Sequence, residues 1–91
     1  MEMLLLKVES KPWEEMWEWL SNHPINEGVD NPSLATNMDE SWQYMGSFRN
    51  NDVVISEFRH RNHPRTNNIY KLSYQHINPI SSDSILKSTK L

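Results

Sequence analysis

An apolar stripe at helical spacing is the clearest pattern in the chain, and it covers residues 12–22. Its members recur at i, i+3, i+4 and i+7, which places them on one side of a helix. They are Trp13, Met16, Trp17 and Leu20. Pro12 suits the first helical turn, and Pro24 ends the helix because the residue before a proline avoids the α region. We expect an amphipathic helix with Glu14, Glu15 and Glu18 on its polar side.

After residue 41 the hydrophobic pattern changes to period two, which is typical of β-strands. Three segments, 41–48, 53–61 and 69–77, are separated by polar turns at 49–52 and 62–68. The short apolar run Met3–Val8 predicts a further strand before the helix. The connection 21–41 is long and polar, so it holds a helical turn near 32–38, has a function, or both.

The order β-α-β-β-β predicts an α+β fold in which one amphipathic helix packs on a small antiparallel sheet. The sheet consists of a three-stranded meander plus the N-terminal strand. We expect a single domain over residues 1–80 and a flexible C-terminal tail over 81–91, although Ile85 and Leu86 can dock. The expected core is aromatic: Trp13, Trp17, Trp42, Tyr44, Tyr70 and Tyr74.

Composition excludes several classes of protein. The 91 residues contain no cysteine, which excludes a disulfide framework, a thiolate zinc site and thiol chemistry. The uncharged run of residues 3–6 is too short for the core of a signal peptide, and no stretch approaches the ~20 apolar residues that span a bilayer. We therefore expect a cytoplasmic protein with no cofactor and no membrane partner.

Charge is divided between the two halves of the chain. Residues 1–45 contain two basic and nine acidic residues, a net charge of −7, whereas residues 46–91 contain seven basic and three acidic residues, a net charge of +4. Such asymmetry indicates polarised surfaces that can bind partners. The alternative is that the two halves attract each other or stay solvated.

The basic residues concentrate in segment 58–65, whose candidate partner-binding residues are Arg59, His60, Arg61, His63 and Arg65. Guanidinium groups match phosphate or carboxylate. The segment is therefore a solubilising hairpin, a site for an acidic protein, or a site for RNA or single-stranded DNA. The chain's net charge of −3 argues against nucleic acid.

Trp19 lies on the flank of the predicted helix and is a further candidate partner-binding residue. Either it packs under the following loop, on Pro24 or Pro32, or it is an exposed anchor of an interface. Glu15 and Glu18 beside it would favour a basic partner.

Metal binding and catalysis have weak signals. His60 and His63, with His23 or His76, are candidate zinc ligands, but His-x-x-His alone is not specific. His60 and His76 can equally be packed neighbours in the core. A metal-independent ribonuclease would need a histidine pair in fixed geometry, which nothing in the sequence provides. We expect no metal site and no enzyme.

These observations together favour a small non-enzymatic protein-binding module that inhibits or regulates a larger enzyme. In size and class the chain is similar to the accessory proteins that phages encode to modulate a host enzyme, although no motif points to a known family. The alternatives are RNA or single-stranded DNA binding through residues 58–65 and a metal-independent ribonuclease. Open sheet edges also allow a homodimer.

Overall fold

A computed structural model describes residues 1–26, 42–60 and 70–90. It is a small α+β fold with one helix and an antiparallel sheet, as the sequence predicts. The elements are β1 (Glu2–Leu6), α1 (Lys11–Ser21), a 3-10 turn (Pro24–Asn26), β2 (Gln43–Asn50), β3 (Val53–His60), β4 (Tyr70–Gln75), a second 3-10 turn (Ser82–Ser84) and β5 (Ile85–Lys90). The predicted helical turn near 32–38 and the predicted turn at 62–68 lie outside the described residues.

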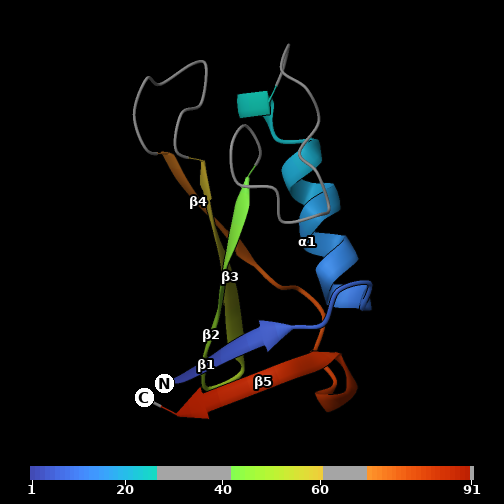
Figure 1. Cartoon of the computed structure of the whole chain (residues 1–91), viewed down its shortest axis with the longest axis vertical. Coiled ribbons are helices and arrows are strands. Elements are labelled where there is room, and N and C mark those ends of the chain that lie inside the picture. Colours follow the sequence, from blue (N-terminus) through green and yellow to red (C-terminus); the bar gives the residue numbers. More distant parts are fainter. Residues whose placement is uncertain (27–41, 61–69, 91) are drawn as a thin grey trace.

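The sheet has five strands in the order β4-β3-β2-β1-β5, and every neighbouring pair is antiparallel. β1 therefore lies between β2 and β5, and its burial alternates: Leu4 and Leu6 are buried, whereas Met3 and Leu5 are half-buried. Glu2 pairs with Lys90, so the two ends of the chain lie side by side (Figure 1). β4 and β5 form the two edges of the sheet.

The C-terminal segment is a strand, which corrects the prediction of a flexible tail over 81–91. Ile85–Lys90 pairs with β1 along its length, and the N–H of Lys7 extends the ladder by donating to the carbonyl of Ser84 at 2.8 Å. A polar composition suggested a tail because it offers little apolar surface. The segment is held instead by backbone hydrogen bonds to β1, which do not depend on side-chain type.

A bulge in β2 turns two polar side chains toward the same face of the sheet. The register between β2 and β3 shifts between Tyr44 and Gly46, where one extra residue enters β2. Gly46 has φ +107°, a conformation that disfavours residues with a side chain. As a result Tyr44 and Ser47 both face the helix, and their hydroxyl oxygens lie 2.6 Å apart.

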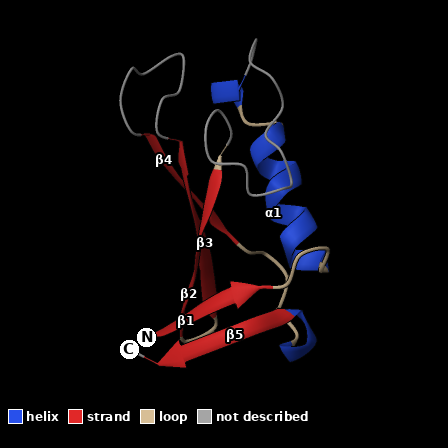
Figure 2. Ribbon diagram, in the orientation of Figure 1, coloured by secondary structure: helices blue, strands red, loops and turns tan. Residues whose placement is uncertain are grey.

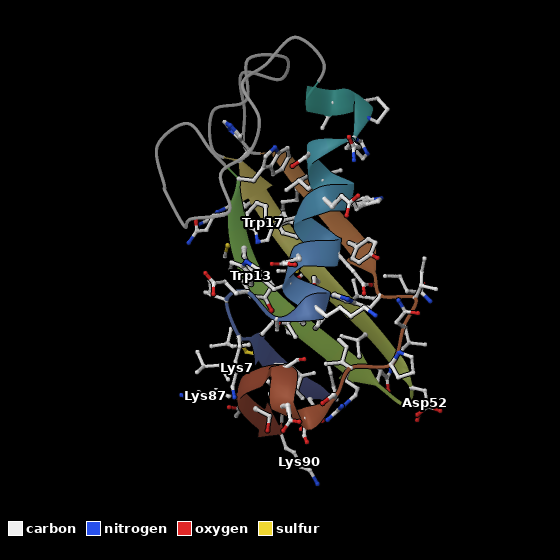
Figure 3. The ribbon with its side chains drawn as sticks, turned by 90° about the vertical axis from the view of Figure 1, so that its right-hand side faces the viewer. Lys7, Trp13, Trp17, Asp52, Lys87 and Lys90 are labelled. Atoms are coloured by element: carbon white, nitrogen blue, oxygen red, sulfur yellow. The ribbon has the colours of Figure 1, made fainter. Side chains whose placement is uncertain are left out.

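Helix α1 covers one face of the sheet and buries the predicted stripe against it (Figure 2). Trp17 is fully buried and meets Phe58 edge-on, with ring centroids 5.1 Å apart. Trp13 meets Tyr44 in the same manner at 5.4 Å. Both tryptophans lie between the helix and the strands (Figure 3), and the buried cluster they belong to is Leu6, Trp13, Met16, Trp17, Leu20, Trp42 and Phe58.

Candidate binding groove

A shallow groove of about 460 Å³ lies along the exposed side of α1, next to the edge strand β4. Its helical residues recur at i, i+3, i+4 and i+7, so their side chains are neighbours on one side of the helix. The lining residues are Glu15, Glu18, Trp19, Asn22, His23, Pro24 and Tyr74. The groove therefore combines carboxylates with aromatic rings.

Trp19 is the aromatic centre of this groove. Its ring lies 5.1 Å from that of Tyr74, at an interplanar angle of 37°, and 5.3 Å from that of His23. It also approaches Phe58 at 6.5 Å, so it rests on the edge of the core while remaining half-buried. Trp19 thus combines the two alternatives raised by the sequence: it packs on its neighbours, with Pro24 in the same groove, and still reaches the surface.

The groove contains two carboxylates, those of Glu15 and Glu18. Among the residues that the structure describes, no salt bridge involves either of them. The side-chain amide of Asn78 donates to both carboxylate oxygens of Glu15, at 3.4 and 3.1 Å. Burial, together with the negative charge of Glu15, raises the pKa of Tyr74 above its usual value. The groove therefore has a negative potential beside the faces of two aromatic rings.

Of the basic segment 58–65, the structure describes residues 58–60, at the end of β3. Arg59 projects from the face of the sheet opposite to the helix, and its Nη2 donates to the Oε1 of Gln43 at 3.0 Å. His60 projects toward the helix side, where it is 3% exposed and packs edge-on against Trp42 at 5.3 Å. Arg61, His63 and Arg65 lie outside the described residues. Because β3 alternates its faces, Arg59 and His60 do not form one surface.

His60 is therefore a core residue, which differs from the prediction that it contacts a partner. It is also distant from His76, because His60 ends β3 whereas the N–H of His76 donates to the carbonyl of Val54 near the start of β3. The suggestion that the two histidines are packed neighbours is wrong for this reason. Among the described residues, no three His, Asp or Glu side chains gather closely enough to hold a metal ion.

A buried chain of hydrogen bonds, which the sequence did not reveal, crosses the helix-facing side of the sheet. The backbone N–H of Leu6 donates to the Tyr44 hydroxyl at 3.3 Å, and Tyr44 is joined to Ser47 at 2.6 Å. Ser47 is joined to Ser56 at 2.6 Å, and Ser56 to the Nε2 of His76 at 2.6 Å. The N–H of Leu6 can only donate, whereas each of the three hydroxyl groups can both donate and accept, so every member of the chain has a hydrogen-bonding neighbour.

Burial also shifts the pKa of two members of this network. Burial raises the pKa of the Tyr44 phenol, which keeps it a hydrogen-bond donor. Burial lowers the pKa of His76, although the nearby charge of Glu15 opposes that shift. His76 is 8% exposed and borders a second cavity of about 410 Å³, which Arg49 and Asp52 also line. Ser56 is fully buried and its hydroxyl is engaged on both sides, so the chain is a structural network.

This network predicts that stability decreases as the pH falls below about 6.5, the ordinary pKa of histidine. In that range the unfolded chain binds a proton at His76 while the folded chain resists it, so protonation favours unfolding. At higher pH His76 is neutral in the folded and the unfolded state, so it does not make the free energy of unfolding depend on pH. The free energy of unfolding, measured with urea at about pH 7.5 and about pH 5.5, should fall more steeply in the wild type than in His76→Gln. Equal slopes in the two proteins would contradict the prediction.

Comparisons with known proteins return nothing for this chain. No family model, no curated protein and no solved structure matches it. In the described ranges, 1–26, 42–60 and 70–90, no helix has the length and apolar character needed to cross a membrane.

Proposed function

We propose that this chain is a small, cytoplasmic, non-enzymatic module that regulates or inhibits a larger enzyme by binding it through the α1–β4 groove. The groove would hold a cationic side chain, lysine or arginine, of that protein. The observation that carries the proposal is the position of Trp19 and Tyr74, 5.1 Å apart, in one groove with the carboxylates of Glu15 and Glu18, which make no salt bridge with the described residues.

Two physical effects support a cation as the ligand. An aromatic face attracts a cation by about 0.5–1 kcal/mol at an exposed site. Carboxylates add a Coulombic attraction and repel phosphates, which favours a protein over RNA or DNA as the partner.

A single amino-acid probe tests the groove. Acetyl-lysine-methylamide, with a free ε-ammonium group, should shift the NMR signal of the Trp19 indole N–H in a saturable titration. The norleucine derivative, which keeps the four side-chain carbons and lacks the ammonium group, should not. Glu15→Gln combined with Glu18→Gln should weaken binding by about fivefold or more, since two exposed charge contacts of up to about 1 kcal/mol each are lost.

Glu14→Gln is the matched control, because Glu14 is an exposed carboxylate of the same helix that does not line the groove. It should bind the lysine derivative as the wild type does. Equal binding of the lysine and norleucine derivatives would contradict the proposal. So would equal weakening by Glu14→Gln and by the double substitution.

A further inference from the structure

The edge strand β4 presents, next to the groove, a row of backbone groups that no other described strand pairs with. The N–H of His76 donates to the carbonyl of Val54 at 2.9 Å, which fixes the alternation along the strand. Tyr74 and Leu72 therefore turn their backbone groups toward β3. Lys71, Ser73 and Gln75 turn theirs away from the sheet, because β3 is the strand's neighbour on one side and none of the described strands lies on the other.

The two edges of the sheet are not equivalent. β5 carries Lys87 and Lys90, which project into solvent (Figure 3), and its pairing with β1 contains an irregularity. Charges and bulges of this kind discourage further strand pairing. β4 contains one charged residue, Lys71, and its pairing with β3 is regular. β4 is therefore the edge better suited to accept another strand.

A strand added to β4 would place alternate side chains beside Tyr74, on the side of the sheet that α1 covers. Because Tyr74 lines the groove together with Glu15 and Trp19, those side chains would enter it. We infer that the partner contributes an extended segment with a basic residue at every second position, which adds antiparallel to β4. This inference rests on the proposed cation groove. Backbone hydrogen bonds would supply affinity, and the groove would select the alternate basic side chains.

The geometry also assigns roles to the two sets of residues in such a segment. In an antiparallel pair, a residue that exchanges hydrogen bonds with Ser73 places its side chain on the same face as Ser73, away from the helix. In the added segment, the residues whose side chains enter the groove point their backbone N–H groups away from β4. In a peptide that alternates lysine and valine, the valine amides would therefore bind the edge while the lysines enter the groove.

Backbone N-methylation of that lysine–valine peptide tests the inference. Methylating the valine amides should weaken binding by at least about tenfold, the equivalent of two or three lost hydrogen bonds. Methylating the lysine amides should leave the affinity within about twofold. Binding is measured by calorimetry against the full chain. Ser73→Pro, which removes one outward N–H at an edge where proline is tolerated, should reproduce the loss, and Ser73→Ala should not.

The outcomes separate this inference from the proposed function. Equal affinity of the three peptides would overturn strand addition, while the groove still stands if acetyl-lysine-methylamide binds. If methylation of the lysine amides weakens binding and methylation of the valine amides does not, the antiparallel direction of the added strand is overturned. Failure of every peptide, with binding of the single lysine derivative intact, would also overturn strand addition alone. Failure of the single lysine derivative would remove the groove itself and the inference with it.

Discussion

Trp17→Ala should destabilise the fold by about 3–5 kcal/mol, the range for removing a large buried aromatic side chain. Trp17 is fully buried and contacts both Trp13, at 5.8 Å between ring centroids, and Phe58, at 5.1 Å. It therefore joins the helix to the centre of the sheet. Small domains have little stability to lose, so we expect the variant to be largely unfolded at 37 °C. Circular dichroism during thermal and urea unfolding provides the measurement.

Trp17→Phe separates the loss of packing from the loss of the indole. The Trp17 Nε1 is buried without a hydrogen-bond partner in the described part of the chain, so its removal takes away an unsatisfied donor. Phenylalanine keeps most of the aromatic contact, and we expect a loss of about 1.5 kcal/mol or less. Trp19→Ala should also cost less than Trp17→Ala, because Trp19 is half-buried. A Trp17→Ala protein as stable as the wild type would contradict this assignment of the core.

The helix and most of its packing were predictable because they depend on local periodicity. Trp13 and Trp17 lie in the buried stripe that the spacing of apolar residues indicates, and α1 ends before Pro24 as expected. Turn chemistry was predictable in the same way. Asn51, in the turn between β2 and β3, has φ 59°, a left-handed conformation that asparagine tolerates.

The features that escaped prediction depend on contacts between distant parts of the chain. β5 is polar, and only its backbone pairing with β1 makes it a strand. The hydrogen-bonded network needs Ser47 and Ser56, which face each other because of the bulge at Gly46, and period-two patterning does not locate bulges. His76 joins the network from a third strand segment.

The groove was predictable in part. The sequence indicated that Glu15 and Glu18 lie near Trp19, since helical spacing determines that arrangement. It did not indicate that Tyr74 meets Trp19, because Tyr74 lies on a strand whose place in the sheet is set by tertiary pairing. Tyr74 adds a second aromatic ring beside the half-buried Trp19. It also places this aromatic pair at the edge of the sheet, where another strand can add.

Ser56→Ala should lower the free energy of unfolding by about 1–3 kcal/mol, although it removes a single oxygen atom. The Ser56 hydroxyl is hydrogen-bonded to the Ser47 hydroxyl and to the Nε2 of His76, both at 2.6 Å. Its removal takes the partner from the Nε2 of His76 and leaves Ser47 with Tyr44 alone, and a buried polar group without a partner costs about 1–3 kcal/mol. Urea unfolding at about pH 7.5, where His76 is neutral, measures the effect without the contribution of protonation.

Ser73→Ala is the matched control, because Ser73 occupies an exposed position on β4 and makes no side-chain hydrogen bond with the described residues. It should change stability by about 0.5 kcal/mol or less. The pair Ser56→Ala and His76→Phe should be less damaging together than the sum of the two single losses, because replacing both partners leaves fewer unpaired groups. If Ser56→Ala is no worse than Ser73→Ala, or if the two losses simply add, the buried hydroxyls do not act as a connected network.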